Sequence, residues 1–103
     1  MAKLVALYKK PTDVTAFNTH YFSIQVPLAK KIPGLRRYEI STGPVSTPQG
    51  GDSPYHLAAI LSFESMAAIQ VALNSPEGLA TAADLANYAQ AGVELLVFDS
   101  RDL

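Results

Sequence analysis

Apolar residues occur in four short runs along the chain, and each run has the composition of a β-strand. The runs are rich in Val, Ile, Leu, Tyr and Phe and are bounded by charged residues, Gly or Pro. They predict strands at residues 3–8, 35–42, 55–63 and 93–98. The stretch from Gly43 to Pro54 is rich in Gly, Pro and Ser and has no apolar period, so it predicts a surface loop.

Two segments between the predicted strands have helical periods. The first is expected to begin with Thr12 as its N-cap and Asp13 in its first turn. Pro27 should loosen its last turns because proline has no backbone N–H. The second segment has two parts, since Ser75 and Pro76 supply a new N-cap and a new first helical position within it. The apolar face of the first helix recurs at steps of three and four and comprises Val14, Phe17, Tyr21, Ile24 and Leu28.

The order of these elements predicts a fold of the α+β class. Strand–helix–strand, repeated once, is the ferredoxin-like βαββαβ plan with a four-stranded antiparallel sheet. The chain has 103 residues, which is the size of one domain, and residues 1–103 contain no internal repeat or low-complexity tract. We therefore expect a single domain.

Both faces of the predicted sheet are apolar. In the third strand, Leu57 and Leu61 lie on one face, and Ala58 and Ile60 lie on the other. Two helices can cover only one face of a four-stranded sheet, and an apolar face left open is unusual in a soluble monomer. The simplest cover is the same face of a second copy, which predicts a homodimer through the sheet. The alternative is that one or two strands are central and simply more apolar.

The composition excludes several classes of function. Hydrophobic residues make up 49% and charged residues 17% of the chain, so disorder is not expected. The net charge is -1 and the basic residues form no stripe, so we do not expect binding to nucleic acid or to an anionic membrane. No segment reaches the roughly 20 apolar residues that span a bilayer, and we expect a soluble, cytoplasmic protein. The chain has no Cys, no metal-ligand spacing and no Gly-rich phosphate loop, so we expect no metal and no cofactor.

Three stretches of the sequence resemble the EthD family. Gln25 to Tyr38 is similar to the family's "HxPL…PGLRRY" region. Pro54-Tyr55, followed by Phe63-Glu64-Ser65 after the third strand, matches its "PY…F.S" pattern, and Ser75 to Tyr88 resembles its second-helix signature. The resemblance covers almost the whole chain. It implies a dimeric α/β barrel, in which two ferredoxin-like units pack sheet against sheet, and work on small molecules such as ethers, aromatic compounds, lactones and polyketides.

One position departs from the family pattern and bears on catalysis. The family usually has His two residues before the Pro-Leu pair, where this chain has Gln25. A Gln cannot exchange protons near neutral pH, but it can orient a hydroxyl or carbonyl by hydrogen bonding. His20 lies five residues earlier, about 140° past a full turn of an α-helix, so it does not simply replace the missing His. We take Gln25, His20 and His56 as candidate catalytic residues. The alternatives are a partly exposed Gln, a boundary His20 and a strand-end or interface His56.

Tyrosines are numerous for a domain without Trp, and some are candidates for binding an apolar or aromatic ligand. Their other role is to fill the core with the hydroxyl at its edge. Asp84 is expected to pair with a Lys or Arg. The candidate substrate-binding residues are Tyr8, Tyr21, Tyr38, Asn87 and Tyr88.

These features lead to three hypotheses. The first is a homodimer that binds an oxygenated, apolar or aromatic metabolite of catabolism or biosynthesis. As an enzyme it would be a cofactor-independent isomerase, cyclase or oxidoreductase. The second is a non-catalytic accessory protein that holds a metabolite for an oxygenase system, and the loss of the family's His favours it. The third is a structural dimer module without a ligand.

Overall fold

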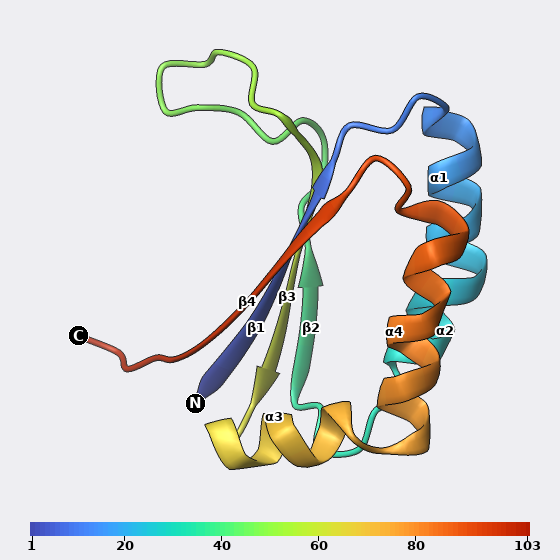
Figure 1. The fold of residues 1–103 in the computed structure, drawn as a ribbon. Coiled ribbons are helices and arrows are strands. Elements are labelled where there is room, and N and C mark those ends of the chain that lie inside the picture. The colour runs from blue at the N-terminus through green and yellow to red at the C-terminus, as the bar shows by residue number, and fades with distance from the viewer.

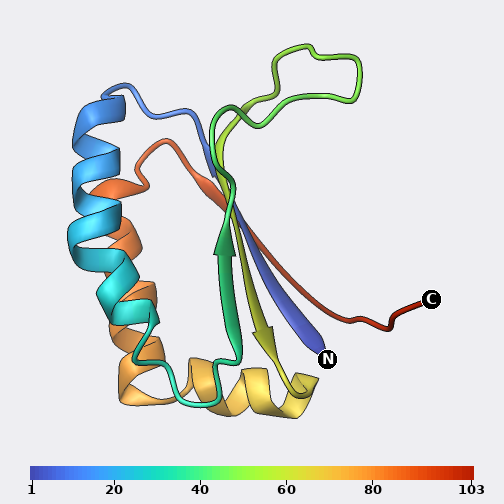
Figure 2. The same ribbon diagram turned by 180° about the vertical axis from the view of Figure 1, so that it is seen from behind.

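The computed structural model describes residues 1–103 and has the ferredoxin-like α+β fold that the sequence predicts. The four strands form one antiparallel sheet in the order β2-β3-β1-β4. Helices α1, α2 and α4 cover one face of it, and α3 lies across its end (Figure 1). The view from behind shows the same two layers (Figure 2). The elements are β1 (Ala2–Lys9), α1 (Val14–His20), a π-helical turn η1 (Tyr21–Gln25), α2 (Val26–Ala29), β2 (Arg37–Ile40), β3 (Tyr55–Phe63), α3 (Met66–Leu73), α4 (Pro76–Tyr88) and β4 (Val93–Asp99).

Side-chain caps determine where the helices begin. The N-cap of α1 is Asp13 and not Thr12, because the Asp13 carboxylate accepts a hydrogen bond from the Ala16 N–H at 3.0 Å. Ser75 caps α4 as predicted, with Pro76 at the first helical position. Capping thus separates α3 from α4, which meet at an angle below the sheet in Figure 1.

The π-helical turn changes which residues of the first helical segment face the core. The Val26 N–H bonds to the Tyr21 carbonyl, five residues back, so the turn holds one residue more than an α-helical turn. Pro27 follows immediately, and its missing N–H disfavours the regular pattern. The predicted stripe is correct at Phe17 and Tyr21 but wrong at Val14, which is 47% exposed, and at Ile24, which is 44% exposed, whereas Gln25 is 4% exposed. The buried positions recur every fourth residue and are Phe17, Tyr21, Gln25 and Ala29.

A β-bulge at the end of the sheet reorients one predicted site residue. Tyr8 pairs with Leu57 and Lys9 with Tyr55, which leaves His56 as the extra residue of β3. In an unbroken strand, alternation would put His56 on the face of Ala58 and Ile60, which the helices leave open. That expectation is wrong, because the His56 ring lies 4.9 Å from the ring of Phe17 in α1.

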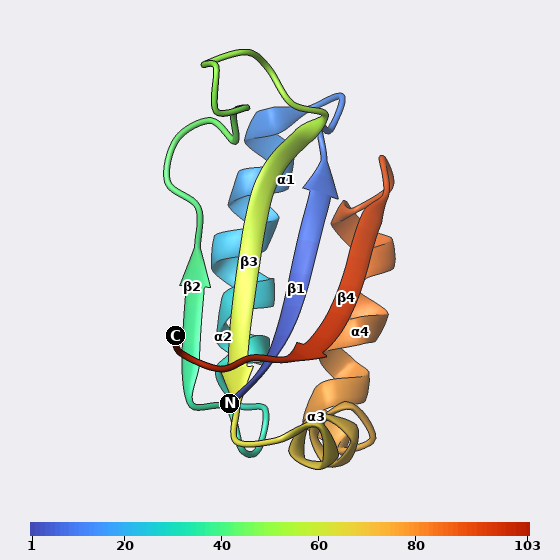
Figure 3. The same cartoon turned by 90° about the vertical axis from the view of Figure 1, so that its left-hand side faces the viewer.

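The sheet face without helices is open, most of all along the edge strand β4, and Figure 3 looks onto it. Cross-strand pairing puts Val5 beside Ile60 on one side and Leu96 on the other. Leu96 is 54% exposed and Phe98, in the next row, is 46% exposed. Nothing in this chain covers these residues, so the two-sided apolar pattern of the sequence leaves a real unpartnered surface.

The remaining expectations concern the loop and the length of β2. Residues 43–54 extend beyond the sheet without a helix or strand, as predicted, and a bridge between Ser46 and Asp52 closes the loop (Figure 1). Regular β2 is shorter than the predicted range of residues 35–42. No helix is both long enough and apolar enough to cross a membrane.

Candidate functional site

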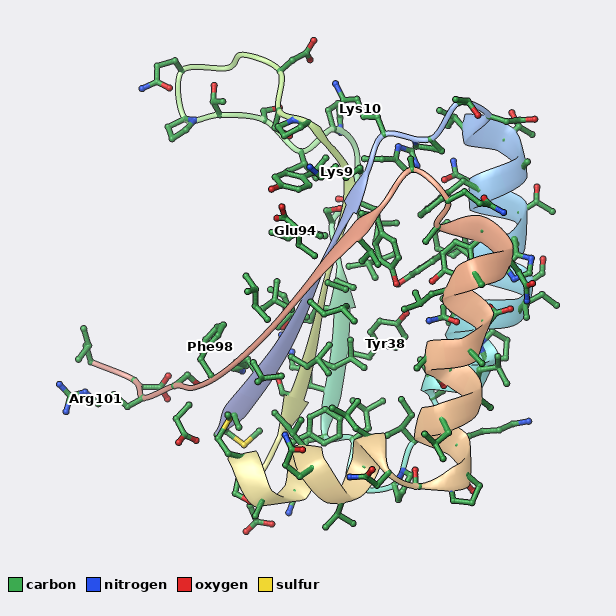
Figure 4. All side chains as sticks on the ribbon, viewed as in Figure 1. Lys9, Lys10, Tyr38, Glu94, Phe98 and Arg101 are labelled. Atoms are coloured by element: carbon green, nitrogen blue, oxygen red, sulfur yellow. The ribbon has the colours of Figure 1, made fainter.

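A small cavity of about 70 Å³ lies between the sheet and the helices. Thirteen of the 16 residues that line it are hydrophobic, and none of the 16 carries a charge. Leu95 of β4 and Leu85 and Ala82 of α4 line one side of it, and Leu95 is 51% exposed, so we take the space between β4 and α4 as the mouth of the cavity. The polar groups that line it come from Tyr8, Tyr21, Gln25, Tyr38 and Thr81. In Figure 4, Tyr38 points from β2 toward the helices.

The Gln25 amide is the unusual group of this cavity. The π-helical turn directs it inward, and its Oε1 is buried without any hydrogen-bond partner. Buried side-chain oxygens of folded proteins nearly always have a partner. Leaving one without a partner costs about 1–3 kcal/mol. The wall therefore presents an acceptor that is ready for a donor from a bound molecule or a water.

Four tyrosine hydroxyls form two pairs around this amide. The Tyr8 and Tyr88 hydroxyls are 2.9 Å apart, and those of Tyr21 and Tyr38 are 2.5 Å apart. One hydrogen bond in each pair uses one phenolic proton and leaves the other free to donate. Each pair therefore keeps one proton to donate, and three of the four hydroxyls, those of Tyr8, Tyr21 and Tyr38, belong to residues that line the cavity.

Burial keeps these tyrosines protonated. It raises the pKa of Tyr8 to about 12, and the hydrogen bond with Tyr88 and the nearby Gln25 amide offset this only in part. Burial likewise raises the pKa of Tyr21, Tyr38 and Tyr88. At neutral pH the cavity therefore contains hydroxyl donors and no phenolate that could accept a proton.

A second cluster of polar residues joins α1 to α4 outside this cavity. His20 Nε2 lies 2.9 Å and 3.0 Å from the two carboxylate oxygens of Asp84, and Asn87 Nδ2 donates to the same carboxylate at 3.0 Å. The His20 ring stacks on Tyr88 with a centroid separation of 5.1 Å. Asp84 therefore pairs with a His and not, as expected, with a Lys or Arg. A groove of about 460 Å³ opens beside His20, Asn87 and Tyr88.

His56 belongs to a third environment. Its Nε2 lies 2.8 Å from Asn18 Oδ1, and it borders a groove of about 690 Å³ below residues 41–45 of the loop. No carboxylate contacts it. The structure holds no group of three or more His, Cys, Asp or Glu side chains that could bind a metal ion.

The structure thus divides the sequence-predicted site residues among three places. Gln25, Tyr8, Tyr21 and Tyr38 share the cavity. His20, Asn87 and Tyr88 line the α1–α4 groove, and His56 lies apart from both groups. His20 therefore does not substitute for Gln25, as expected. The reason is that His20 pairs with Asp84 of α4, and not the rotation along an α-helix that the sequence suggested.

Sequence reasoning missed Asp84 and Thr81 as residues of these sites. Thr81, Asp84 and Tyr88 are buried at steps of three and four, which places them on the inward face of α4. That spacing was a usable signal for burial. It gave no indication that the partner of Asp84 is 64 residues away in the sequence.

Comparisons with known proteins agree over most of the chain. The EthD domain matches residues 9–92. An uncharacterized 11.0 kDa protein in the thcB-thcC intergenic region of Rhodococcus erythropolis is 38% identical over 99 residues, which cover 96% of this chain and 94% of that protein.

Solved structures give the same result. An ethyl tert-butyl ether D (EthD) family protein from Bacillus halodurans superposes with a TM-score of 0.89 at 34% identity, covering 98% of this chain and 99% of that one. A dimeric ferredoxin-like protein of unknown function from Thermobifida fusca has a TM-score of 0.68 at 16% identity, covering 94% and 88% of the two chains, and shares only the fold. With a family match over most of its length and relatives above 30% identity, this chain belongs to the EthD family.

Proposed function

We propose that this chain binds a small, neutral, oxygenated molecule whose polar head enters the cavity and donates a hydrogen bond to Gln25. The observation that carries the proposal is the buried Gln25 Oε1 without a partner in an otherwise apolar wall. A ligand hydroxyl would satisfy that oxygen, and the free tyrosine protons would donate to the ligand's own oxygen.

The lining of the cavity selects for a ligand without charge. None of the lining residues carries a charge, and most are hydrophobic. A carboxylate or phosphate would lose its hydration without gaining a cation, which costs several kcal/mol. A neutral alcohol, phenol or enol keeps its hydrogen bonds and loses little.

The dimensions of the cavity divide the ligand into two parts. About 70 Å³ is far below the roughly 300–1,000 Å³ of sites that hold a whole drug-sized ligand, so the cavity itself admits a head group only. The rest of the molecule would lie at the mouth between β4 and α4, against Leu95 and Leu85. This placement would bury Leu95, which is half exposed in the free chain.

The chemistry of the cavity favours binding over catalysis. Gln25 cannot accept a proton, and the raised pKa values keep the tyrosines in their neutral form. An isomerase, cyclase or oxidoreductase mechanism that begins by removing a proton therefore has no base inside the cavity. A role in holding or delivering a metabolite requires no such base.

Two matched probes test the proposal by calorimetry. Cyclohexanol carries a hydroxyl donor, whereas its methyl ether keeps the ring and the oxygen acceptor but cannot donate. We expect the native chain to prefer the alcohol by roughly five- to tenfold, the value of one hydrogen bond to a buried amide. In Gln25→Leu that preference should disappear, while the ether binds nearly as before.

If the native chain and Gln25→Leu prefer the alcohol over the ether by the same factor, Gln25 does not contact the head group. Cyclohexanecarboxylate serves as the charge control, since the proposal requires it to bind at least tenfold more weakly than the alcohol. A carboxylate that binds equally well would contradict the neutral-ligand argument.

We further propose that the open sheet face pairs with the same face of a second copy. The row Val5, Ile60 and Leu96 of that face is apolar, and Lys3, Arg37, Glu39 and Glu94 lie around it, so both charge signs are available for a two-fold interface. The fold neighbour from Thermobifida fusca is a dimer, which supports the same arrangement here.

Light scattering tests this pairing. The native chain should have twice its mass of 11.0 kDa, and Leu96→Glu should shift it toward the single-chain mass. Val71→Glu is the matched control, because Val71 is an exposed apolar residue of α3, away from the open face. A native monomer, or a Leu96→Glu variant that stays dimeric, would refute the proposal.

A further inference from the structure

The His20–Asp84 pair is built like an oriented base, and the Gln25 cavity does not use it. Both oxygens of the Asp84 carboxylate lie within hydrogen-bond distance of His20 Nε2, so this nitrogen carries the proton. The lone pair of a neutral ring is then on Nδ1, which has no partner within the chain. The Asn87 amide and the stacked Tyr88 ring hold the two groups in place.

The space beside this pair is large enough for a whole small molecule. The groove measures about 460 Å³, within the range of ligand sites and several times the volume of the Gln25 cavity. Its wall consists of residues 11–13, α1 and the C-terminal end of α4. Phe17 and Tyr88 line that wall but are only 3% and 5% exposed, whereas His20 is partly exposed beside them.

The charges around the groove determine the class of ligand. Asp13 lines it and Asp84 lies behind His20, while no Lys or Arg is present in its wall. The titratable groups that face His20 from α1, α4 and the preceding loop are Asp13, Asp84 and Tyr88. The C-terminal end of α4 also carries partial negative charge. A free anion finds no Lys or Arg in this wall, so the ligand enters neutral, and a ring with a weakly acidic O–H fits both the size of the groove and the free nitrogen.

We propose that this groove is a second ligand site, in which His20 Nδ1 accepts the proton of a bound phenol. The phenolic O–H bond breaks, the proton forms the new Nδ1–H bond, and the electron pair stays on the phenolate oxygen. The Asp84 carboxylate stabilises the resulting imidazolium through Nε2–H. The site supplies the proton acceptor that the Gln25 cavity lacks, at a different place on the molecule.

A coloured probe reports this proton transfer directly. 4-Nitrophenol is colourless when neutral and absorbs visible light as its phenolate. It is titrated with the full chain in buffer below the probe's own pKa, where the neutral form predominates. We expect the protein to raise the ratio of phenolate to phenol by roughly tenfold at saturation, as a charge-assisted hydrogen bond allows.

Four variants locate the effect. His20→Gln and Asp84→Asn should each abolish the rise in absorbance, because the first removes the base and the second removes the charge behind it. His56→Gln is the matched histidine control, since His56 bonds to an uncharged amide, and it should leave the rise unchanged. Gln25→Leu should also leave it unchanged, which separates this site from the proposed Gln25 cavity.

Circular dichroism and the urea midpoint identify any variant that fails to fold. If His20→Gln does not fold, the nearly isosteric Asp84→Asn variant still tests the proposal. The inference is overturned if the native chain causes no rise in phenolate, if it binds the probe without changing its colour, or if His20→Gln in folded form retains the rise. Loss of the rise in Gln25→Leu would also refute it, by placing the probe in the cavity.

Discussion

Replacing Gln25 by Met should make the free protein more stable. The two side chains have similar length and volume, and Met suits a wall that is mostly apolar. The amide oxygen has no partner in the free chain, so its removal relieves a desolvation cost of about 1–3 kcal/mol. For a domain of this size, each kcal/mol corresponds to a rise in Tm of about 4–8 °C.

Urea unfolding and thermal unfolding at one fixed protein concentration measure this effect, since association would make the Tm depend on concentration. Gln70→Met is the matched control, because Gln70 lies exposed in α3 and both residues favour helix. We expect that control to stay within about 0.5 kcal/mol of the native chain. If Gln25→Met is neutral or destabilising, the amide oxygen is satisfied in solution and the inference of a waiting acceptor is wrong.

Three further predictions follow from contacts elsewhere in the fold. Burial raises the pKa of Tyr8 from its ordinary value near 10 to about 12 in the folded chain, so its contribution to stability is fully present below about pH 10. Roughly 3 kcal/mol should be lost as pH rises from about 10 to 12, and a level urea midpoint over this range would contradict it. Gly78→Ala should cost about 1–3 kcal/mol in urea unfolding despite its better helix propensity, because the new Cβ would lie 2.0 Å from the Ala72 carbonyl oxygen. Asp13→Ala should cost about 1 kcal/mol by the same assay and Thr12→Ala less than about 0.5 kcal/mol, the reverse of what a Thr12 cap would give.

Local signals in the sequence were sufficient for the architecture. The run from Tyr55 to Phe63 has an unbroken β-rich composition and forms β3 with those limits. Ser75 and Pro76 mark the start of α4 because capping depends only on nearby backbone groups. Alternate residues of the predicted strands also showed that both faces of the sheet are apolar.

The contents of the sites could not be predicted from the same signals. A stripe drawn at α-helical steps selects Ile24, but the extra residue of the π-helical turn brings Gln25 inward instead. Likewise, strand alternation assumes an unbroken register, and the bulge beside Tyr8 moves His56 to the helix face. Both changes depend on how distant segments pack.

Pairing between helices was also beyond local reasoning. His20 and Asp84 each have several potential partners in the sequence, and only the packing of α1 against α4 brings them together. The resemblance to the EthD family directed attention to Gln25. The same resemblance did not indicate which residue pairs with Asp84, because the family motifs name no partner for it.

The extra residue between Tyr21 and Gln25 gives this helix an unusual tolerance of changes in length. Deleting a residue inside an α-helix rotates everything beyond it by about 100°, which would turn a lining residue away from its cavity. Here, loss of Phe22, Ser23 or Ile24 would reduce the wide turn to an ordinary one and leave a three-residue step from Tyr21 to the Gln25 amide. That step still lies on one helix face. The gene could therefore lose one codon at this point and keep the same lining of the cavity.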